Sequence, residues 1–303
     1  MPPHGGYGMN SGVIDAFDLA WRLAALHKAY GGTLLLQSYN LERRPMMIRA
    51  LERSLRHLLE HIKLAAMNAQ HSSLLEADTP EGEDVRRQIG QFIDDSGPDT
   101  TDLGIELDLR YAETSPVIYQ DDDGSREHEW DVKRYIPSTR PGCRAPHVFL
   151  KDGVTSTYDL FGGGPEWTLV LFVNDDNNND SIIDRQHASG IFLSVAKPLN
   201  FPLKLATLHN EPHAQHILEY RDLVLVRPDT HIAWRGYVHS IGDAADIERV
   251  LRVVSGHFPS PGFVASTAAA KGEDIDMRFR ELVSGFTDMH RGSSSSSTTI
   301  RDE

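Results

Sequence analysis

Three glycines near the start of the chain form a pattern that could hold an anionic or electron-rich ligand. The stretch from Pro3 to Asn10 contains Gly5, Gly6 and Gly8. Glycines lack Cβ atoms, so backbone N–H groups in such a loop can approach a ligand closely, and the positive end of a following helix dipole favours a carbonyl oxygen or a phosphate. Asn10 or Ser11 is the expected N-cap. The alternative interpretation is a glycine turn before a buried helix, because this motif is weak.

The residues around these glycines are more specific than the glycines themselves. The run PPHGGYGMNSGVIDAFDLAWRLAAL begins at Pro2, and YNLERRP follows from Tyr39 to Pro45. Together they resemble the flavin-contacting segment of the FAD-dependent aromatic hydroxylases, the family of phenol hydroxylase and p-hydroxybenzoate hydroxylase. The resemblance implies that the loop and the helix start cradle the isoalloxazine ring of FAD. The implied cofactor-binding residues are Pro3, Gly5, Gly6, Gly8, Met9 and Asn10.

A second block, later in the chain, resembles the C-terminal thioredoxin-like domain of the same family. It consists of RPGCRAPH from Arg140, YDLFG from Tyr158 and LVRPDTHIAWR from Leu225. The two blocks follow one another in the family's own order, and the resemblance covers about residues 2–66 and 103–255. It implies a thioredoxin fold that serves interdomain and dimer contacts.

The resemblance also implies an activity. Members of the family reduce FAD with NAD(P)H, activate O2 on the reduced flavin and hydroxylate phenolic or other aromatic substrates. The Gly-x-Gly-x-x-Gly unit that binds the ADP half of FAD has no match in this sequence, so we expect a truncated form that lacks the N-terminal dinucleotide-binding unit. The alternative is a non-catalytic protein that dimerises or binds partners through its thioredoxin-like domain. No residue is assigned a catalytic role.

Length and composition bound the class of protein. With 303 residues, 40% hydrophobic and 24% charged, the chain can hold two globular domains. It contains no apolar run of about 18 residues, no signal-peptide pattern and a single cysteine, Cys143. We therefore expect a cytoplasmic protein that does not associate with membranes. The net charge of −14 disfavours nucleic acid as a partner.

Most of that charge lies in one segment. Residues 76–129 contain 17 Asp or Glu and four Arg, a net charge of −13. We interpret this segment as a solvated, partly flexible connector, with a cation site as the alternative. Within it, apolar residues alternate with polar ones from 105 to 111, which predicts a half-buried strand like those of the family's substrate domain.

The residue pattern near the N-terminus predicts three successive helices. Residues 13–29 are apolar on nearly every face except for a narrow stripe formed by Asp15, Asp18 and Arg22, which predicts a helix that is buried on most sides, normally against a sheet. Thr33 is the expected cap of the next helix, and Pro45 is expected in the first turn of a third.

The fold class predicted from these elements is α/β, a helical remnant of an FAD-binding domain followed by a thioredoxin-like domain. The expected segments are the FAD-domain remnant at 1–66, the acidic connector at 67–130, the thioredoxin-like domain at 131–258 and a largely disordered tail at 259–303. Strands are predicted at 147–150, 157–161, 167–173, 202–208, 222–227 and 231–236. Helices are predicted near 181–195, 213–219, 243–254 and 273–284.

Other motifs predict little chemistry. A thioredoxin-type redox centre needs a Cys-x-x-Cys pair, whereas the corresponding residues are Asn174 to Asn177 and Cys143 lies before that strand, where a packing role is expected. Zinc binding by the histidines, a phosphate loop at 161–165 and a calcium loop at 174–180 each lack residues that such sites require. We expect no metal site. The histidines considered as zinc ligands are His209, His213 and His216.

Overall fold

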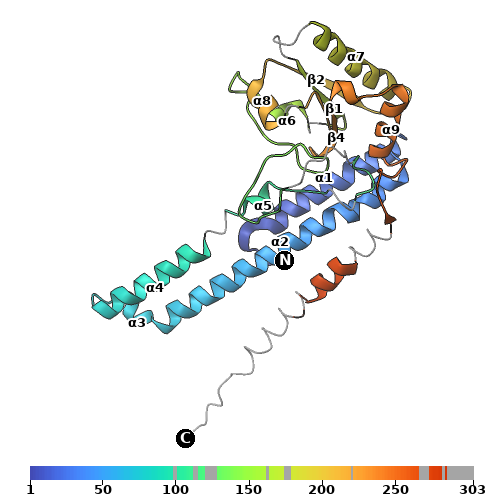
Figure 1. Ribbon diagram of the computed structural model, residues 1–303. Coiled ribbons are helices and arrows are strands. Elements are labelled where there is room, and N and C mark those ends of the chain that lie inside the picture. The colour runs from blue at the N-terminus through green and yellow to red at the C-terminus, as the bar shows by residue number, and fades with distance from the viewer. Residues whose placement is uncertain are drawn as a thin grey trace. The chain divides into compact units, whose positions relative to one another are not determined.

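The computed structural model describes residues 1–97, 101–111, 115–119, 128–161, 164–173, 179–219, 221–265, 273–281 and 284 (Figure 1). The chain divides into two compact units, Met1–Phe263 and Val264–Glu303. In the second unit, residues 273–281 form a helix, as predicted. The elements below belong to the first unit.

The chain begins with a short 3-10 helix that leads directly into a long α-helix. These elements are η1 (His4–Gly6) and α1 (Tyr7–His27). The predicted caps Asn10 and Ser11 are therefore wrong, since α1 begins at Tyr7 and its N-cap is Gly6. Asn10 lies within the first turns, where its side-chain Nδ2 donates to the Gly6 carbonyl at 2.9 Å. That bond offsets the low helix propensity of a glycine-rich start.

A single helix, α2 (Thr33–Gln70), replaces the two helices that Pro45 was expected to separate. Gly32, not Thr33, is its N-cap. One buried stripe continues across the proline at helical spacing, so packing of this face outweighs the local cost of Pro45. The stripe is formed by Leu35, Ser38, Glu42, Met46, Ala50, Ser54 and His57.

The acidic connector, expected to be solvated and partly flexible, is largely helical in its described part, and most residues from 80 to 96 are exposed. It forms α3 (Ser72–Leu75), α4 (Pro80–Ser96) and α5 (Leu103–Glu106). Thr79 caps α4 by accepting from the Gly82 amide at 3.2 Å, and the helix buries Val85 and Ile89. The strand predicted at 105–111 is wrong, because α5 occupies its first residues. Toward its end, a single bridge pairs Arg110 with Cys143.

The sheet has the order β2-β1-β3-β4, with β1 and β2 parallel and β3 antiparallel to both of its neighbours. Its helices lie on both faces (Figure 1), and α7, α8 and α9 confirm the predicted helices. This is a thioredoxin-type α/β domain. The strands are β1 (Trp167–Val173), β2 (Leu203–His209), β3 (Leu223–Val226) and β4 (Ile232–Gly236). The helices are α6 (Thr157–Leu160), α7 (Asn179–Ala196), α8 (Pro212–Ile217) and α9 (Ala244–Val254).

Two of the predicted strands are wrong. Residues 157–160 form α6, whose start is fixed by a capping box in which Ser156 and Asp159 satisfy each other's backbone amides. The segment 147–150 makes only one bridge, between Phe149 and Ser156. At 157–160 this capping interaction competes with the apolar residues that suggested a strand.

The core of the sheet continues into the N-terminal helices. Side chains of β1 alternate between two apolar clusters, one against α7 and α9 and one against α6 and α8. Trp21 of α1 belongs to the first cluster and packs edge-on against Trp167 of β1, with ring centroids 5.8 Å apart. This shared core explains why the chain forms one compact unit up to Phe263.

The end of α9 contacts the start of α2 closely. The Gly32 amide donates to the Ser255 carbonyl at 2.7 Å, and the Leu34 amide donates to the Gly256 carbonyl at 3.2 Å. A Cβ atom at Gly32 would lie 2.2 Å from the Gly256 oxygen, so only glycine fits. Backbone carbonyls from α9 thus satisfy the free donors at the start of α2.

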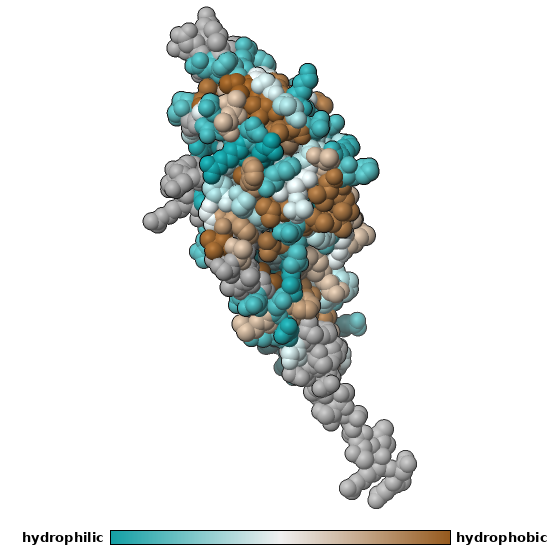
Figure 2. Space-filling model, turned by 90° about the vertical axis from the view of Figure 1, so that its right-hand side faces the viewer, coloured by the Kyte–Doolittle hydropathy of each residue, from teal (hydrophilic) through white to brown (hydrophobic). Residues whose placement is uncertain are grey.

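The outer face of α1 is exposed rather than buried, contrary to the prediction. Its large apolar side chains reach up to 79% exposure, at Met9. The residues of the polar stripe, Asp18 and Arg22, are fully buried instead. Figure 2 shows hydrophobic side chains in several patches among hydrophilic ones on one face of the molecule. None of the helices that the structure describes is long and apolar enough to cross a lipid bilayer.

Candidate functional site

The six sequence-predicted residues lie together where η1 passes into α1. Gly5 and Gly6 adopt left-handed conformations, with φ of 76° and 71°, which turn the chain into the helix. No side chain caps α1, so the amides of its first turn remain available as donors at the positive end of the helix dipole. Gly8 and Met9 are exposed at this end. The arrangement suits a carbonyl oxygen or an anionic group of a ligand.

Gly5 and Gly8 differ in whether the local structure has room for a side chain. A Cβ atom at Gly5 would lie 2.4 Å from the Tyr7 ring, and the positive φ excludes most other residues. At Gly8 a Cβ atom would meet only the Met1 sulfur, at an ordinary 3.7 Å. The fold therefore requires Gly5, whereas the local structure tolerates a side chain at Gly8.

A cavity of about 320 Å³ opens beside this loop. Loop residues Gly5, Tyr7 and Asn10 form one wall, while Pro3, Gly6, Gly8 and Met9 do not line it. The guanidinium of Arg49 lies over the Trp130 ring, 4.6 Å from its centroid. The volume is at the lower end of the range for small-molecule sites. The other walls are formed by Ser11, Ile14, Arg43, Met46, Ala50, Gly104, Ile105, Glu106, Asp108 and Leu109.

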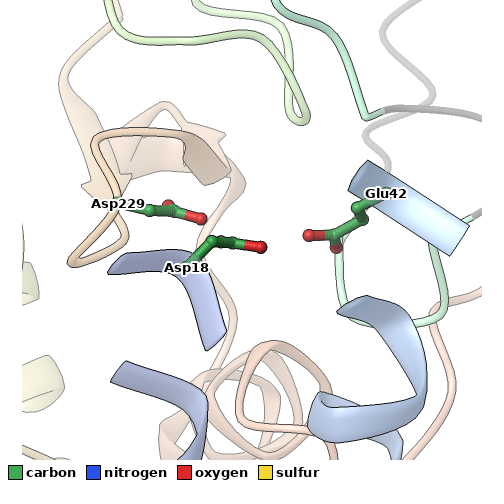
Figure 3. A group of neighbouring side chains, drawn as sticks. All are labelled: Asp18, Glu42 and Asp229. Carbon is green, nitrogen blue, oxygen red and sulfur yellow. The ribbon is translucent and has the colours of Figure 1, made fainter. Parts of the chain in front are cut away.

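A buried ionic cluster lies farther along α1, and sequence reasoning missed it. Figure 3 shows three carboxyl groups pointing into one space, from α1, from α2 and from the β3–β4 turn. Arg22 contacts Asp18 and Glu42, and Arg227 contacts Glu42 and Asp229. All five side chains are almost fully buried. The signal in the sequence was the position of Glu42 in the ERR run and of Arg227 and Asp229 in the RPD run of the two family-like blocks.

The two guanidinium groups of this cluster balance two of its three carboxylates, and the third, Asp18, is partly protonated near neutral pH. Burial, followed by the charge of Asp229, raises the pKa of Asp18 to about 7. Burial also opposes ionisation of Glu42 and Asp229, but the charge of Arg227 outweighs it and lowers both pKa values. The three carboxylates approach one another as metal ligands would, with oxygens within 4.8 Å. Two guanidinium groups already lie among them, so we interpret the cluster as structural.

A second contact joins the same elements. Arg43 of α2 donates to the Tyr111 hydroxyl at 2.8 Å and to Asp15 of α1 at 2.7 Å. The Tyr111 ring stacks on His231, with centroids 4.0 Å apart. The ionic and aromatic contacts together fix α1 and α2 against the thioredoxin-like domain.

Two family models match the chain in the places that the resemblance indicated. A model described as an FAD binding domain matches residues 1–54, and one described as the C-terminal domain of aromatic-ring hydroxylases matches residues 138–257. The chain belongs to the FAD-dependent aromatic-ring hydroxylases. It represents a C-terminal portion of them, and the cofactor of this family is FAD.

Individual relatives agree with this membership. An FAD-dependent monooxygenase, opdD, of Penicillium oxalicum is 34% identical over 255 residues, which cover 84% of this chain and 46% of the relative. A 2,4-dichlorophenol 6-monooxygenase of Delftia acidovorans is 28% identical over 271 residues, again covering 84% and 46%. The chain thus spans less than half the length of these relatives.

Solved structures show the same fold. The rebeccamycin biosynthetic enzyme RebC with reduced flavin matches with a TM-score of 0.65 and 31% identity, over 84% of this chain and 42% of RebC. The flavin-dependent monooxygenase PieE, in complex with FAD and substrate, also has a TM-score of 0.65, at 24% identity.

The remaining candidates from the sequence lie apart from the loop. Cys143 is buried beside the sheet. His213 and His216 are exposed on α8, and His209 ends β2. Residues 174–178, which include the position of a redox pair and most of the calcium-loop candidate at 174–180, lie outside the described part of the chain, as do residues 162 and 163.

Proposed function

We propose that this chain is the C-terminal part of an FAD-dependent monooxygenase that hydroxylates a phenolic or other aromatic substrate with NAD(P)H and O2. The observation that carries the proposal is the uncapped, glycine-rich start of α1 beside a small cavity. Bound FAD would supply the redox and oxygen chemistry. The residues of this chain would bind and orient the flavin ring and exclude water around it.

The proposed flavin contacts are the six residues predicted from the sequence. The amides of Gly8 and Met9 belong to the first turn of α1, where helices leave donors unsatisfied. Gly8 would allow the flat ring to approach the backbone, and Gly5 and Gly6 would hold the turn that exposes these donors. Asn10 would border the ring from the wall of the cavity that it lines. Pro3 would border the ring at the start of η1.

The proposed substrate site is the cavity beside the loop. Trp130, Met46 and Ile14 offer an aromatic and apolar lining, which suits a flat aromatic ring, and its volume of about 320 Å³ suits a small substrate. From the family resemblance we also infer a cytoplasmic location and a homodimer formed through residues 131–258. Sedimentation of the purified protein at several concentrations tests the dimer.

The activity can be tested in a chimera. The N-terminal part of the Penicillium oxalicum relative, which supplies the region that this chain does not span, is joined ahead of Met1. The expected product is a yellow protein that oxidises NAD(P)H faster when a phenol is added. The matched control joins the same piece to the relative's own C-terminal region. A folded, monodisperse chimera without flavin would contradict the proposal, and would favour a non-catalytic binding protein.

The isolated chain serves as the second control. Two or three backbone hydrogen bonds to the flavin ring, each worth about 0.5 to 1.5 kcal/mol, do not exceed the cost of immobilising the ligand. We expect an affinity for FAD of about millimolar or weaker in a fluorescence titration. Micromolar binding by a monomer would show that the 303 residues bind flavin unaided.

A further inference from the structure

One buried carboxylate lies directly behind the glycine loop and contacts four other side chains. Asp102, in the acidic connector, is fully buried. Its Oδ2 accepts from the Tyr7 hydroxyl at 2.8 Å and from Arg53, and it lies 2.8 Å from Nε2 of His57. Its Oδ1 pairs with Lys133 at 2.8 Å. The carboxylate therefore joins α1, α2 and the segment that enters the thioredoxin-like domain.

Tyr7 places this contact within the loop. It is the first residue of α1 and lies between Gly6 and Gly8 in the sequence, and its own side chain is buried. A second bond, from the Ser54 hydroxyl to the Pro2 carbonyl at 2.8 Å, holds the other end of the loop to α2. The loop is thus attached to α2 on both sides of Gly5 and Gly6, directly at Pro2 and through Asp102 at Tyr7.

The segment that carries Asp102 is itself fixed. The Gly104 amide donates to the Val132 carbonyl at 3.0 Å, and a Cβ atom at Gly104 would lie 2.0 Å from the Asp131 oxygen. This close backbone contact leaves Asp102 little freedom to move. A hydroxyl bonded to it is held in place by the same contact.

The protonation states of Tyr7 and Asp102 suit a fixed hydrogen bond that holds the loop rather than a proton relay. Burial opposes ionisation of Asp102, but hydrogen bonds from Arg53 and Lys133 outweigh it and hold its pKa well below the usual range. Burial, and then the bond to Asp102, raise the pKa of Tyr7 well above its usual value. At neutral pH the pair is a neutral phenol donating to a carboxylate, and neither group changes its protonation state near this pH.

We infer that Tyr7 and Asp102 are positioning residues that hold the glycine loop in its ligand-facing conformation. This inference rests on the proposed function only in naming flavin as the ligand. Neither side chain needs to touch the flavin, since both act through the backbone that Tyr7 fixes. A purely structural role would instead stabilise the whole unit without a local effect on the loop.

The test measures amide hydrogen exchange in the 303-residue chain. For Tyr7→Phe we expect amides between residues 4 and 14 to exchange about three- to tenfold faster, as the loss of one hydrogen bond implies, and the rest of the unit to be unchanged. Tyr30→Phe is the matched control, because it removes a buried hydroxyl just beyond the opposite end of α1. Asp102→Asn should produce the same local pattern with a larger increase.

Two outcomes would overturn the inference. One is unchanged exchange between residues 4 and 14 in Tyr7→Phe, and the other is a uniform increase throughout residues 1–263. Tyr7→Phe in the chimera should weaken FAD binding by a similar factor. If local exchange becomes faster but the affinity for FAD does not change, the loop is positioned by Tyr7 but flavin is not its ligand. Failure of the unsubstituted chimera to bind FAD counts against the proposed function, while the exchange result decides the positioning role independently.

Discussion

Arg227 donates two hydrogen bonds to the carboxylate of Glu42, at 3.0 and 2.9 Å, although 185 positions separate the two residues in the chain. Both side chains are buried, and Arg227 also contacts Asp229 in its own turn. The bidentate pairing connects the thioredoxin-like domain to α2, the helix that packs against α1 behind the candidate flavin loop. The C-terminal domain thereby contributes to the position of a site that it does not itself form.

Removing this arginine should destabilise the protein strongly. Arg227→Gln leaves Glu42 and Asp229 as buried charges without their main partner, and the expected loss is about 3 to 5 kcal/mol of unfolding free energy. Urea denaturation provides the measurement. Arg252→Gln, in a partly exposed pair with Glu248, is the control and should cost about 1 kcal/mol or less. A loss of only about 1 kcal/mol in Arg227→Gln would show that the buried ionic cluster contributes little to the unfolding free energy.

Asp18 should make stability depend on pH near neutrality. Its folded-state pKa is about 7, above the ordinary 3.8, because burial and Asp229 disfavour its charge. The contribution of this proton to stability is therefore complete at low pH and is lost as the pH rises through the folded pKa. We expect the stability difference between the wild type and Asp18→Asn to be largest below about pH 4, to fall between about pH 4 and about pH 7, and then to level off. A difference that rises or stays flat would contradict the assigned protonation.

Gly8→Val tests the flavin contact with little effect on the fold. A side chain at Gly8 meets only the Met1 sulfur in this structure, but it would occupy the space over which a flat ring must lie. In the chimera we expect the substitution to abolish the yellow colour of the purified protein. Gly90→Val, at another helical glycine with open space around it, should leave the colour unchanged. Flavin retained at one equivalent in Gly8→Val would refute the assignment of the loop.

Cys143 should prove inert. The sulfur is buried, it is the only cysteine of the chain, and the thioredoxin-type reaction requires two. We expect no reduction of insulin disulfides, and Cys143→Ala should change stability by no more than about 1 to 2 kcal/mol, as for a small core truncation. Reductase activity that disappears in Cys143→Ala would overturn this interpretation.

The sequence predicted the elements whose signals are local. The four strands of the sheet and helices α7, α8 and α9 appear where continuous apolar runs and helical spacing placed them. The prediction was wrong where a local pattern competes with a distant partner. Asp18 and Arg22 were recognised only as part of a narrow polar stripe, because Arg227, which pairs with Asp18, lies about two hundred residues farther along the chain. Asp102 was counted only as one acid of the acidic connector, because the cations that it pairs with lie on other elements. Pairings of this kind have no signature in a short window of sequence.

The contact between Gly32 and Gly256 bears on the order in which the protein can be made. The first donors of α2 are satisfied by carbonyls that leave the ribosome more than two hundred residues later. During synthesis the backbone donors at the start of α2 therefore lack these partners until the residues that follow α9 have been made. A chain that ended before residue 255 would lack both carbonyls, and the first donors of α2 would remain without these partners.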